Sequence, residues 1–350
     1  MRRLKVLVIF GGCSSEYGVS LQSAYAVIKN LDKEKYEPVL AGISKTGDWY
    51  YFSGDIEKIP EDTWNNEKDC VPAALSPNRS ERGFLIRYPE GDKLVVIDAA
   101  FPVLHGKNGE DGTVQGAITL AGIPLAGCGV MASALCMDKD RAHRLAAAVC
   151  GVRVPRAIVL QNVPNEKKIY DFAAETGYPL YVKPVKAGSS YGVTKVTEES
   201  DLLRAVQDAF LYDNEVILEE NIEGFEVGCA VLGTDKLITG EVDEIELSSG
   251  FFDFTEKYTL KTSAIHVPAR IPEDTSERVK DMAKQIYRSL GCTGFARVDM
   301  FLTPSGELVF NEVNTIPGFT EHSRYPGMMK AAGYSFSDIL DRIIRQAVKQ

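Results

Sequence analysis

Hydrophobic and polar positions follow different periods in different parts of the chain. Residues 4–10 (LKVLVIF) form a short apolar run that ends at Gly11-Gly12, which is typical of a buried strand followed by a turn. Apolar residues then recur at helical spacing from Leu21 to Leu31, and a second apolar run follows at 36–44. A strand, a helix and a second strand in this order predict an α/β N-terminal domain with a Rossmann-like start.

The pattern weakens after this unit and then becomes helical. Residues 45–93 contain short strand-like segments such as GDWYYF and GFLIRY, and we expect one buried strand over 95–106 (VVIDAAFPVLHG). Residues 132–151 predict a single helix that carries Lys139 near its middle. This change of pattern places the first domain boundary near residue 130.

The rest of the chain mixes strands and helices. Helices are expected at 166–176, 201–212, 276–291 and 335–348, and strands at 156–160, 294–302 and 307–315. Residues 178–196 predict a strand, a glycine-rich loop and a second strand. We therefore expect an α/β domain at 1–130, a small α+β domain at 131–225 and a C-terminal domain at 226–350.

Composition and charge narrow the class of protein. The 350 residues carry a formal net charge of −10, which argues against nucleic acid or an anionic membrane as a partner, although local Lys and Arg could still bind an anionic nucleotide in a cleft. The seven Cys are scattered without a Cys-x-x-Cys spacing, so we expect reduced thiols in a cytoplasmic protein and no zinc site. The basic start and apolar run could resemble a secreted leader, but VLVIF is too short, and we prefer a first strand.

Two segments near the C-terminus place polar side chains on strand-like patterns. In 308–314 (LVFNEVN), strict alternation puts Phe310, Glu312 and Asn314 on one face, and in GFARVDMFL Arg297 and Asp299 share a face. A turn at 303–306 joins the two segments, so we expect a hairpin on which Asp299, Glu312 and Asn314 converge. Two carboxylates and an amide oxygen suit Mg²⁺. The alternative is a simple salt bridge between Arg297 and an acid.

A phosphate site is the natural companion of such a metal site. In VKPVKAGSSYGV (182–193), Lys183 lies among apolar neighbours and needs an anion, while the loop offers backbone N–H groups and hydroxyls. The alternative is a solvated hairpin loop. The following segment, VILEENIEGFEVG, could bind adenine and ribose, and a formal G-x-G-x-x-A at Gly127 is only a weak dinucleotide match.

At this point the chain resembles the D-alanine–D-alanine ligase family, whose members have the three-domain ATP-grasp fold. The resemblance rests on GGCSSEYGVSLQSA, HGKNGEDGTVQG, MDKDRAHRL, VKPVKAGSSYGV, EKYTLKT, GFARVDMF and NEVNTIPGFTEHS, which occur in the family's order over nearly the whole chain. One departure is Gly18, where the family usually has an acidic residue, and it bears on a minor contact near the first helix.

The resemblance implies ligands for most of these residues. ATP would be held by Lys139, Lys183, Ser189, Ser190, Glu219, Glu220, Ile222, Glu226 and Lys257, and two Mg²⁺ ions, for which Mn²⁺ could substitute, by Asp299, Glu312 and Asn314. Glu16 would receive the ammonium group of the first D-alanine, with His105 nearby. Arg297 and the Gly318 N–H would face the oxyanion that develops when an amine attacks an acyl phosphate. Residues 248–262 would be a lid, with Tyr258 linked to Ser189 and Glu16.

The second substrate depends on a few residues around the lid and the last helices. Tyr258 is unlike the ligases that use D-lactate. Arg324 and Phe252 depart from the D-alanine pattern and, with Ser323, resemble the D-alanine–D-serine ligases of vancomycin resistance, close to the VanG group. We therefore expect D-serine, with D-alanine as the alternative and a non-catalytic nucleotide-binding protein as a further one. Another possibility is that Arg324 points to solvent. The family resemblance also implies a homodimer.

Overall fold

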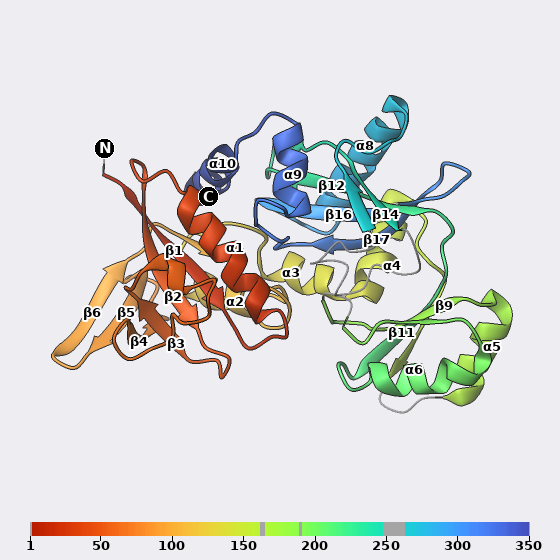
Figure 1. The fold of residues 1–350 in the computed structure, drawn as a ribbon, viewed down its shortest axis with the longest axis horizontal. Coiled ribbons are helices and arrows are strands. Elements are labelled where there is room, and N and C mark those ends of the chain that lie inside the picture. Colours follow the sequence, from red (N-terminus) through yellow and green to blue (C-terminus); the bar gives the residue numbers. More distant parts are fainter. Residues whose placement is uncertain (1, 162–164, 189–190, 248–262, 350) are drawn as a thin grey trace.

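The structure, a computed structural model, describes residues 2–161, 165–188, 191–247 and 263–349. Within these residues the strands form three sheets, which follow one another along the chain (Figure 1). None of the helices in this part of the chain is both long and apolar enough to cross a membrane. The mixed α/β architecture agrees with the expected fold class.

The N-terminal sheet has the strand order β6-β5-β4-β3-β2-β1-β7. Its strands are β1 (Leu4–Gly11), β2 (Tyr36–Ile43), β3 (Trp49–Phe52), β4 (Cys70–Leu75), β5 (Gly83–Tyr88), β6 (Gly91–Val96) and β7 (Ala99–Pro102). The strand β1 pairs in parallel with both β2 and β7, and the helix α1 (Tyr17–Asn30) connects β1 to β2. The predicted βαβ start is therefore confirmed, and the remaining pairs continue the sheet in antiparallel fashion.

The expected single strand at 95–106 is wrong, because two strands meet there. The first, β6, pairs with β5 at the far edge of the sheet, whereas β7 pairs with β1 at the opposite edge. The chain turns at Ile97 and Asp98, where the Asp98 carboxylate accepts hydrogen bonds from the Lys5 backbone N–H and from Arg2, both at 2.8 Å. An acid inside an apolar run therefore marked a turn, and the alternation pattern alone did not separate the two strands.

The middle of the chain forms a four-stranded antiparallel sheet with the order β10-β9-β11-β8. Its strands are β8 (Ala157–Gln161), β9 (Leu180–Pro184), β10 (Thr194–Val196) and β11 (Glu215–Glu220), with the helices α5 (Glu166–Thr176) and α6 (Leu202–Ala209). The apolar faces of both helices pack on this sheet in one cluster. The two predicted strands within 178–196 are confirmed as the β9–β10 pair, and residues 189–190 of the predicted loop lie outside the described part of the chain.

The third sheet has the order β15-β14-β12-β16-β17, and β13 pairs with β12. Its strands are β12 (Phe225–Leu232), β13 (Ile238–Thr239), β14 (Asp243–Leu247), β15 (Ser263–His266), β16 (Phe295–Leu302) and β17 (Leu308–Asn314), and the helices α8 (Glu273–Ser289) and α9 (Arg324–Ala331) accompany them. The strands β16 and β17 form the predicted antiparallel hairpin. The helix α9 was not predicted.

The expected single helix over 132–151 is also wrong. The structure has two helices, α3 (Val130–Met137) and α4 (Lys139–Cys150), which are separated by Asp138 in an extended conformation. The Asp138 carboxylate accepts from the Arg141 backbone N–H at 3.0 Å and caps α4. Lys139 is therefore the first residue of a helix, held where the chain changes direction.

The last helix, α10 (Phe336–Lys349), packs on the N-terminal part of the molecule (Figure 1). Its buried face, which includes Ile339, Ile343 and Ile344, belongs to the same apolar cluster as residues of α1 and β1. Tyr36 at the start of β2 donates a hydrogen bond to Asp341 at 2.9 Å. The C-terminal helix α10 therefore contributes to the same hydrophobic core as β1 and α1.

Candidate active site

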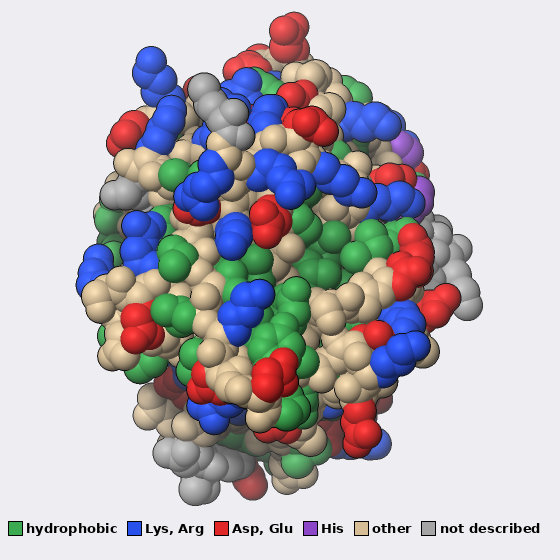
Figure 2. All heavy atoms as spheres, turned by 90° about the vertical axis from the view of Figure 1, so that its left-hand side faces the viewer, with side chains coloured by type: hydrophobic (Ala, Val, Ile, Leu, Met, Phe, Trp, Pro, Cys, Tyr) green, Lys and Arg blue, Asp and Glu red, His purple; other side chains and the backbone are tan. Residues whose placement is uncertain are grey.

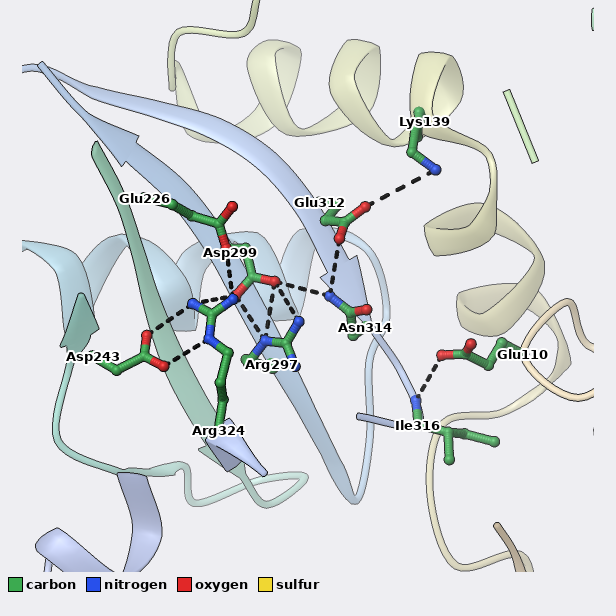
Figure 3. Close-up of polar contacts among 10 residues, drawn as sticks. All are labelled: Glu110, Lys139, Glu226, Asp243, Arg297, Asp299, Glu312, Asn314, Ile316 and Arg324. Atoms are coloured by element: carbon green, nitrogen blue, oxygen red, sulfur yellow. Dashed lines mark hydrogen bonds and ion pairs between the residues drawn. The ribbon is translucent and has the colours of Figure 1, made fainter. Parts of the chain in front are cut away.

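The hairpin of β16 and β17 brings the predicted metal-binding residues together. Asp299 lies opposite Glu312, and Arg297 lies opposite Asn314 (Figure 3). The Asn314 Nδ2 donates to Asp299 Oδ2 at 3.0 Å and lies 3.5 Å from Glu312 Oε1. Arg297 donates to Asp299 through Nε and Nη2 at 2.7–3.0 Å. The convergence is thus confirmed, and the alternative salt bridge forms as part of the same cluster.

The prediction that Phe310 shares a face with Glu312 is wrong because β17 contains a bulge. Glu312 pairs with Asp299, but Phe310 pairs with the next residue, Met300, which leaves Asn311 as an extra residue in β17. Cross-strand partners share a face, so Phe310 and Glu312 lie on opposite faces. Phe310 is fully buried in the core, and the bulge lets Glu312 and Asn314 face the site.

Two lysines lie near this hairpin, and one of them contacts it. Lys139, at the start of α4, donates to the Ala187 carbonyl at 2.8 Å, and its Nζ lies 4.0 Å from Glu312 Oε2. Lys183 on β9 pairs with Glu219 Oε2 on β11 at 2.6 Å. Burial alone would lower the pKa of Lys183, but the Glu219 carboxylate outweighs it and raises that pKa. Two fixed cations therefore stand between the predicted phosphate loop and the metal cluster.

The Glu219 side chain leaves one carboxylate oxygen without a partner. Glu219 is 1% exposed, and its Oε1 has no hydrogen bond from the described residues, although Oε2 binds Lys183. A buried acceptor of this kind costs about 1–3 kcal/mol when unpaired. The His143 Nδ1 atom lies 3.6 Å from it.

The other residues predicted to hold adenosine lie around the same strand. Glu220, at the end of β11, accepts from the Arg156 backbone N–H at 3.0 Å and from Arg153 at 3.1 Å, so its carboxylate organises the chain rather than facing the site alone. Ile222 is partly exposed in the connection that follows. Glu226, on β12, accepts from Arg324 Nη1 at 2.6 Å.

The carboxylate of Glu16 lies where the N-terminal and middle parts of the chain meet. It is 6% exposed, and a Cβ placed on Gly106 or on Gly188 would lie 2.4 or 2.6 Å from its Oε2. Glycine at both positions therefore lets two loops approach this acid. Ser14 supports it by donating to the His105 carbonyl at 2.6 Å and accepting from the Glu16 backbone N–H at 3.1 Å.

His105, which we predicted near Glu16, connects two segments that are far apart in the chain. One ring nitrogen lies 3.0 Å from the Ile316 carbonyl and the other 3.2 Å from Ser23 Oγ. Burial lowers the pKa of His105 to about 4, so the ring is neutral at pH 7. His105 thus connects α1 to the segment that follows β17, one residue before Pro317-Gly318.

The residue Glu110 was missed by sequence reasoning. It accepts from the backbone N–H of Gly106 at 2.8 Å. It also accepts from the backbone N–H of Ile316 at 3.4 Å (Figure 3). Burial, followed by the nearby Glu16 carboxylate, raises the pKa of Glu110 to about 8. The available signal was its place inside the quoted HGKNGEDG motif, where an acid is surrounded by glycines.

Gly318 and Ser323 lie close together after β17. A Cβ on Gly318 would be 3.0 Å from Ser323 Oγ, and that oxygen accepts from the Thr320 backbone N–H at 3.0 Å. The same turn is anchored by Phe319, whose backbone N–H donates to Ser23 Oγ at 3.2 Å. The Gly318 backbone is therefore held in a short turn between Ser23 and the start of α9.

The idea that Arg324 points to solvent is wrong. The residue is 9% exposed and binds Asp243 through Nε and Nη2 at 2.7 and 2.8 Å, in addition to Glu226 (Figure 3). Its Nη2 also lies 3.4 Å from Asp299 Oδ1. Asp243 is fully buried, and sequence reasoning missed it because one acid among the four of GEVDEIEL looks like a surface residue.

Five predicted site residues lie outside the described part of the chain. These are Ser189, Ser190, Phe252, Lys257 and Tyr258, and the expected lid at 248–262 lies outside it as well. The remaining predicted residues lie on the third sheet, on the four-stranded sheet, at the start of α4 and in the loops around them.

The donor set at the hairpin fits magnesium. The candidate set is the two carboxylates and one amide that the hairpin brings together. Hard oxygen ligands of this number suit Mg²⁺, which keeps water and phosphate oxygens as its other ligands. A four-stranded sheet that carries Lys183, a helix that begins at Lys139 and a second sheet that carries this oxygen set are the features of an ATP-grasp enzyme, the class in which a nucleotide is held between two such sheets.

Comparison with known proteins leads to the family. The family model described as "D-ala D-ala ligase N-terminus" matches residues 5–128, and that described as "D-ala D-ala ligase C-terminus" matches residues 148–345. The chain therefore belongs to the D-alanine–D-alanine ligase family, whose members are ATP-dependent ligases that generally use Mg²⁺.

Three relatives cover nearly the whole chain. The crystal structure of VanG D-Ala:D-Ser ligase from Enterococcus faecalis superposes with a TM-score of 0.91 at 55% identity, covering 99% of this chain and 100% of the other. Vancomycin C-type resistance protein VanC1 of Enterococcus gallinarum is 43% identical over 98% of both chains. A D-alanine–D-alanine ligase of Caldicellulosiruptor bescii is 41% identical, covering 100% of this chain and 96% of the other.

Proposed function

We propose that this protein joins D-alanine to D-serine through a D-alanyl phosphate, for the peptidoglycan precursors of vancomycin resistance. The observation that carries the proposal is the buried Arg324 group. Arg324 and Asp243 form a buried charged pair beside Asp299, a proposed metal ligand. A subsite with a charged wall can hydrogen-bond a hydroxyl, and it disfavours an analogue that leaves those groups unpaired. The VanG relative, a D-Ala:D-Ser ligase, supports the choice of D-serine, and the VanC1 relative supports the link to vancomycin resistance.

The chain's own residues suggest how the first half of the reaction proceeds. A carboxylate is a poor electrophile, and transfer of the γ-phosphoryl group of ATP converts it into an acyl phosphate with a good leaving group. Lys139 and Lys183 would neutralise phosphate charge from one side. Asp299, Glu312 and Asn314 would hold the two Mg²⁺ ions, which supply charge neutralisation when bound. Glu16, buried against Gly106 and Gly188, would bind the ammonium group of D-alanine.

The second half needs a stabilised oxyanion. Arg297 lies on the same strand face as Asp299, with its guanidinium held by that carboxylate. The Gly318 N–H lies in the anchored turn after β17. Together they would donate to the oxygen that becomes negative when the amine of the second substrate attacks, and the loss of one such donor typically lowers the rate by about 10²–10³. Ser189, Tyr258, Lys257 and Phe252 keep their predicted roles at the phosphates and the lid.

Several further expectations accompany this function. We propose a cytoplasmic enzyme with domains at 1–130, 131–225 and 226–350, supported by the three sheets. We also propose the family's homodimer. Figure 2 shows the face of the molecule that includes the N-terminal sheet, with apolar side chains among charged ones, and Leu94 and Val96 on its edge strand β6 are 40% and 54% exposed. Light scattering would show a mass near 77 kDa for a dimer of the 38.4 kDa chain.

A phosphate-release assay tests the function. The enzyme is given ATP, Mg²⁺ and D-alanine, with or without D-serine, and the dipeptides are identified by mass. The proposal requires D-alanyl-D-serine as the main product when both amino acids compete. A main product of D-alanyl-D-alanine would support the alternative, and nucleotide binding without phosphate release would point to a non-catalytic protein.

The role of Arg324 has its own test. Arg324→Leu should shift the competing turnover from D-serine toward D-alanine. Because this change also strands the Asp243 charge, the matched control is Arg324→Leu combined with Asp243→Asn. If the wild type and the folded double variant gave the same product ratio, Arg324 and Asp243 would not determine the choice between D-serine and D-alanine.

A further inference from the structure

The turn at residues 316–319, which follows β17, has only three backbone N–H groups, because Pro317 has none. The N–H groups of its buried first and last residues, Ile316 and Phe319, both donate to side chains. The Gly318 N–H makes no hydrogen bond to any residue that the structure describes. The direction of this one available donor is therefore decided by how its two neighbours are held.

Three side chains from the N-terminal part of the chain hold these neighbours. The Ile316 N–H donates to Glu110 at 3.4 Å (Figure 3), and the Ile316 carbonyl oxygen lies 3.0 Å from His105 Nδ1. The Phe319 N–H donates to Ser23 Oγ at 3.2 Å. Ser23 belongs to α1, and the other two side chains follow β7. The first sheet and its helix thus fix a turn that belongs to the third sheet.

His105 and Ser23 are linked to each other, and each group in this relay has one possible role. A carbonyl oxygen only accepts, so His105 Nδ1 must donate to Ile316. Burial lowers the pKa of His105 to about 4, so at pH 7 the ring is neutral and Nε2 carries a lone pair. Ser23 Oγ lies 3.2 Å from Nε2, so its hydroxyl donates there and its own lone pair accepts from Phe319. Removing this one fully buried hydroxyl leaves a donor and an acceptor unpaired.

We propose that Ser23 is a positioning residue of the ligase reaction, which directs the Gly318 N–H toward the developing oxyanion by holding Phe319 directly and Ile316 through His105. An oxyanion donor acts only when it lies about 2.7–3.1 Å from the oxygen that becomes negative, so a small rotation of the turn weakens it. The inference rests on the proposed function, in which the Gly318 N–H is such a donor. It adds that a helix residue far from the reacting atoms sets the position of that donor.

The test compares two buried hydroxyls on the same helix. Ser23→Ala cuts the relay, and Ser20→Ala is the matched control, because Ser20 is also fully buried and lies one turn earlier on α1. The Ser20 hydroxyl accepts from the Gly11 N–H at 2.8 Å and donates to the Val103 carbonyl, so its partners lie outside the turn. The full chain is assayed for kcat and for the KM of ATP with Mg²⁺, D-alanine and D-serine.

Two further measurements separate positioning from stability. Inhibition is measured with a dipeptide analogue that has a tetrahedral phosphinate in place of the reacting carbon, because such an analogue resembles the transition state. Thermal unfolding reports the stability of each variant. His105→Phe is a second variant, which keeps a buried ring but cuts the relay from its other side, and it decides the question if Ser23→Ala does not fold.

The expected result is a selective loss. Ser23→Ala should lower kcat and weaken inhibition by the phosphinate about tenfold each, less than the loss of a whole donor, because the Gly318 N–H is misdirected rather than removed. The KM for ATP should change less than about twofold, since the donor acts only in the transition state. Ser20→Ala should lower the melting temperature without this loss, and His105→Phe should reproduce it.

The opposite outcomes are equally clear. If Ser23→Ala changed kcat and inhibition no more than Ser20→Ala, or if it weakened the phosphinate and ATP alike, the hydroxyl would have a merely structural role and the inference would be overturned. A wild type that forms no dipeptide would instead contradict the proposed function.

Discussion

The cluster around Arg324 makes a quantitative prediction about stability. Arg324 is buried and binds Asp243, which is fully buried, with two hydrogen bonds of 2.7 and 2.8 Å. Replacing Arg324 by methionine keeps much of the side-chain volume but removes all its N–H donors. The Asp243 carboxylate would then be a buried charge without its main partner.

The size of the effect follows from this geometry. Breaking a buried ion pair from one side typically costs about 3–5 kcal/mol, because the remaining charge is not compensated. The converse change, Asp243→Asn, is milder, since Arg324 keeps Glu226 at 2.6 Å and Asp299 at 3.4 Å. We expect about 1–2 kcal/mol for that variant. The double variant should be more stable than Arg324→Met alone, because the uncompensated charge is gone.

The assay is a double-mutant cycle on the free energy of unfolding. Urea unfolding is followed by circular dichroism for the wild type, both single variants and the double variant, at one pH and one salt concentration. An interaction energy of at least about 1.5 kcal/mol is expected between the two positions. If Arg324→Met lost less than about 1 kcal/mol, or if the two effects simply added, the ion pair would not stabilise the fold as argued.

Three further predictions follow from other sites. Asp138→Ala should destabilise the protein by about 1 kcal/mol, because α4 loses its N-terminal cap. It should also raise the KM for ATP, because Lys139 loses its fixed position. Asp138→Asn keeps a capping oxygen and should therefore change the stability and the KM less. The Lys186 hydrogen bond, then that of Gln161, lowers the pKa of Glu215 to about 2, so its stabilisation is present above the ordinary pKa of 4.5 and is lost as the pH falls toward 2. Glu215→Gln should remove on the order of 1–2 kcal/mol of unfolding free energy at pH 7 and much less at pH 2, and an equal loss at both would contradict the ion pair. Burial raises the pKa of Glu110 to about 8, so the folded state loses stability as the pH rises from the ordinary pKa of 4.5 through 8. The melting temperature of Glu110→Gln should exceed that of the wild type by an amount that grows over this pH range and levels off above it. A difference in melting temperature that stays constant with pH would refute the raised pKa of Glu110.

Local patterns were sufficient where the neighbouring residues alone decide the structure. The βαβ start, the β9–β10 pair and the hairpin at 295–314 were predicted from periodicity and turn residues, and their existence is confirmed. The polar residues of that hairpin were also enough to predict that Asp299, Glu312 and Asn314 converge. A short turn fixes which residues of the two strands lie opposite each other, so the convergence of these side chains depends on residues that are close in the sequence.

The errors came from features that depend on distant partners. Strict alternation could not reveal the bulge at Asn311, because the bulge exists only in the pairing with β16. The break at Asp138 was hidden because the residues on both sides favour a helix, and a single cap decides where it restarts.

The sequence by itself determined the family, several of the main strands and the convergence of Asp299, Glu312 and Asn314 on one hairpin, because these depend on motifs and on short-range periodicity. Only the tertiary structure decided that Arg324 is buried on Asp243, that Ser23 and His105 hold the turn at Gly318, and that α10 completes the N-terminal core. The physical reason is that burial and charge pairing are properties of contacts between residues far apart in the chain. An isolated Arg, Asp or His in a sequence carries no sign of the partner that will desolvate or neutralise it.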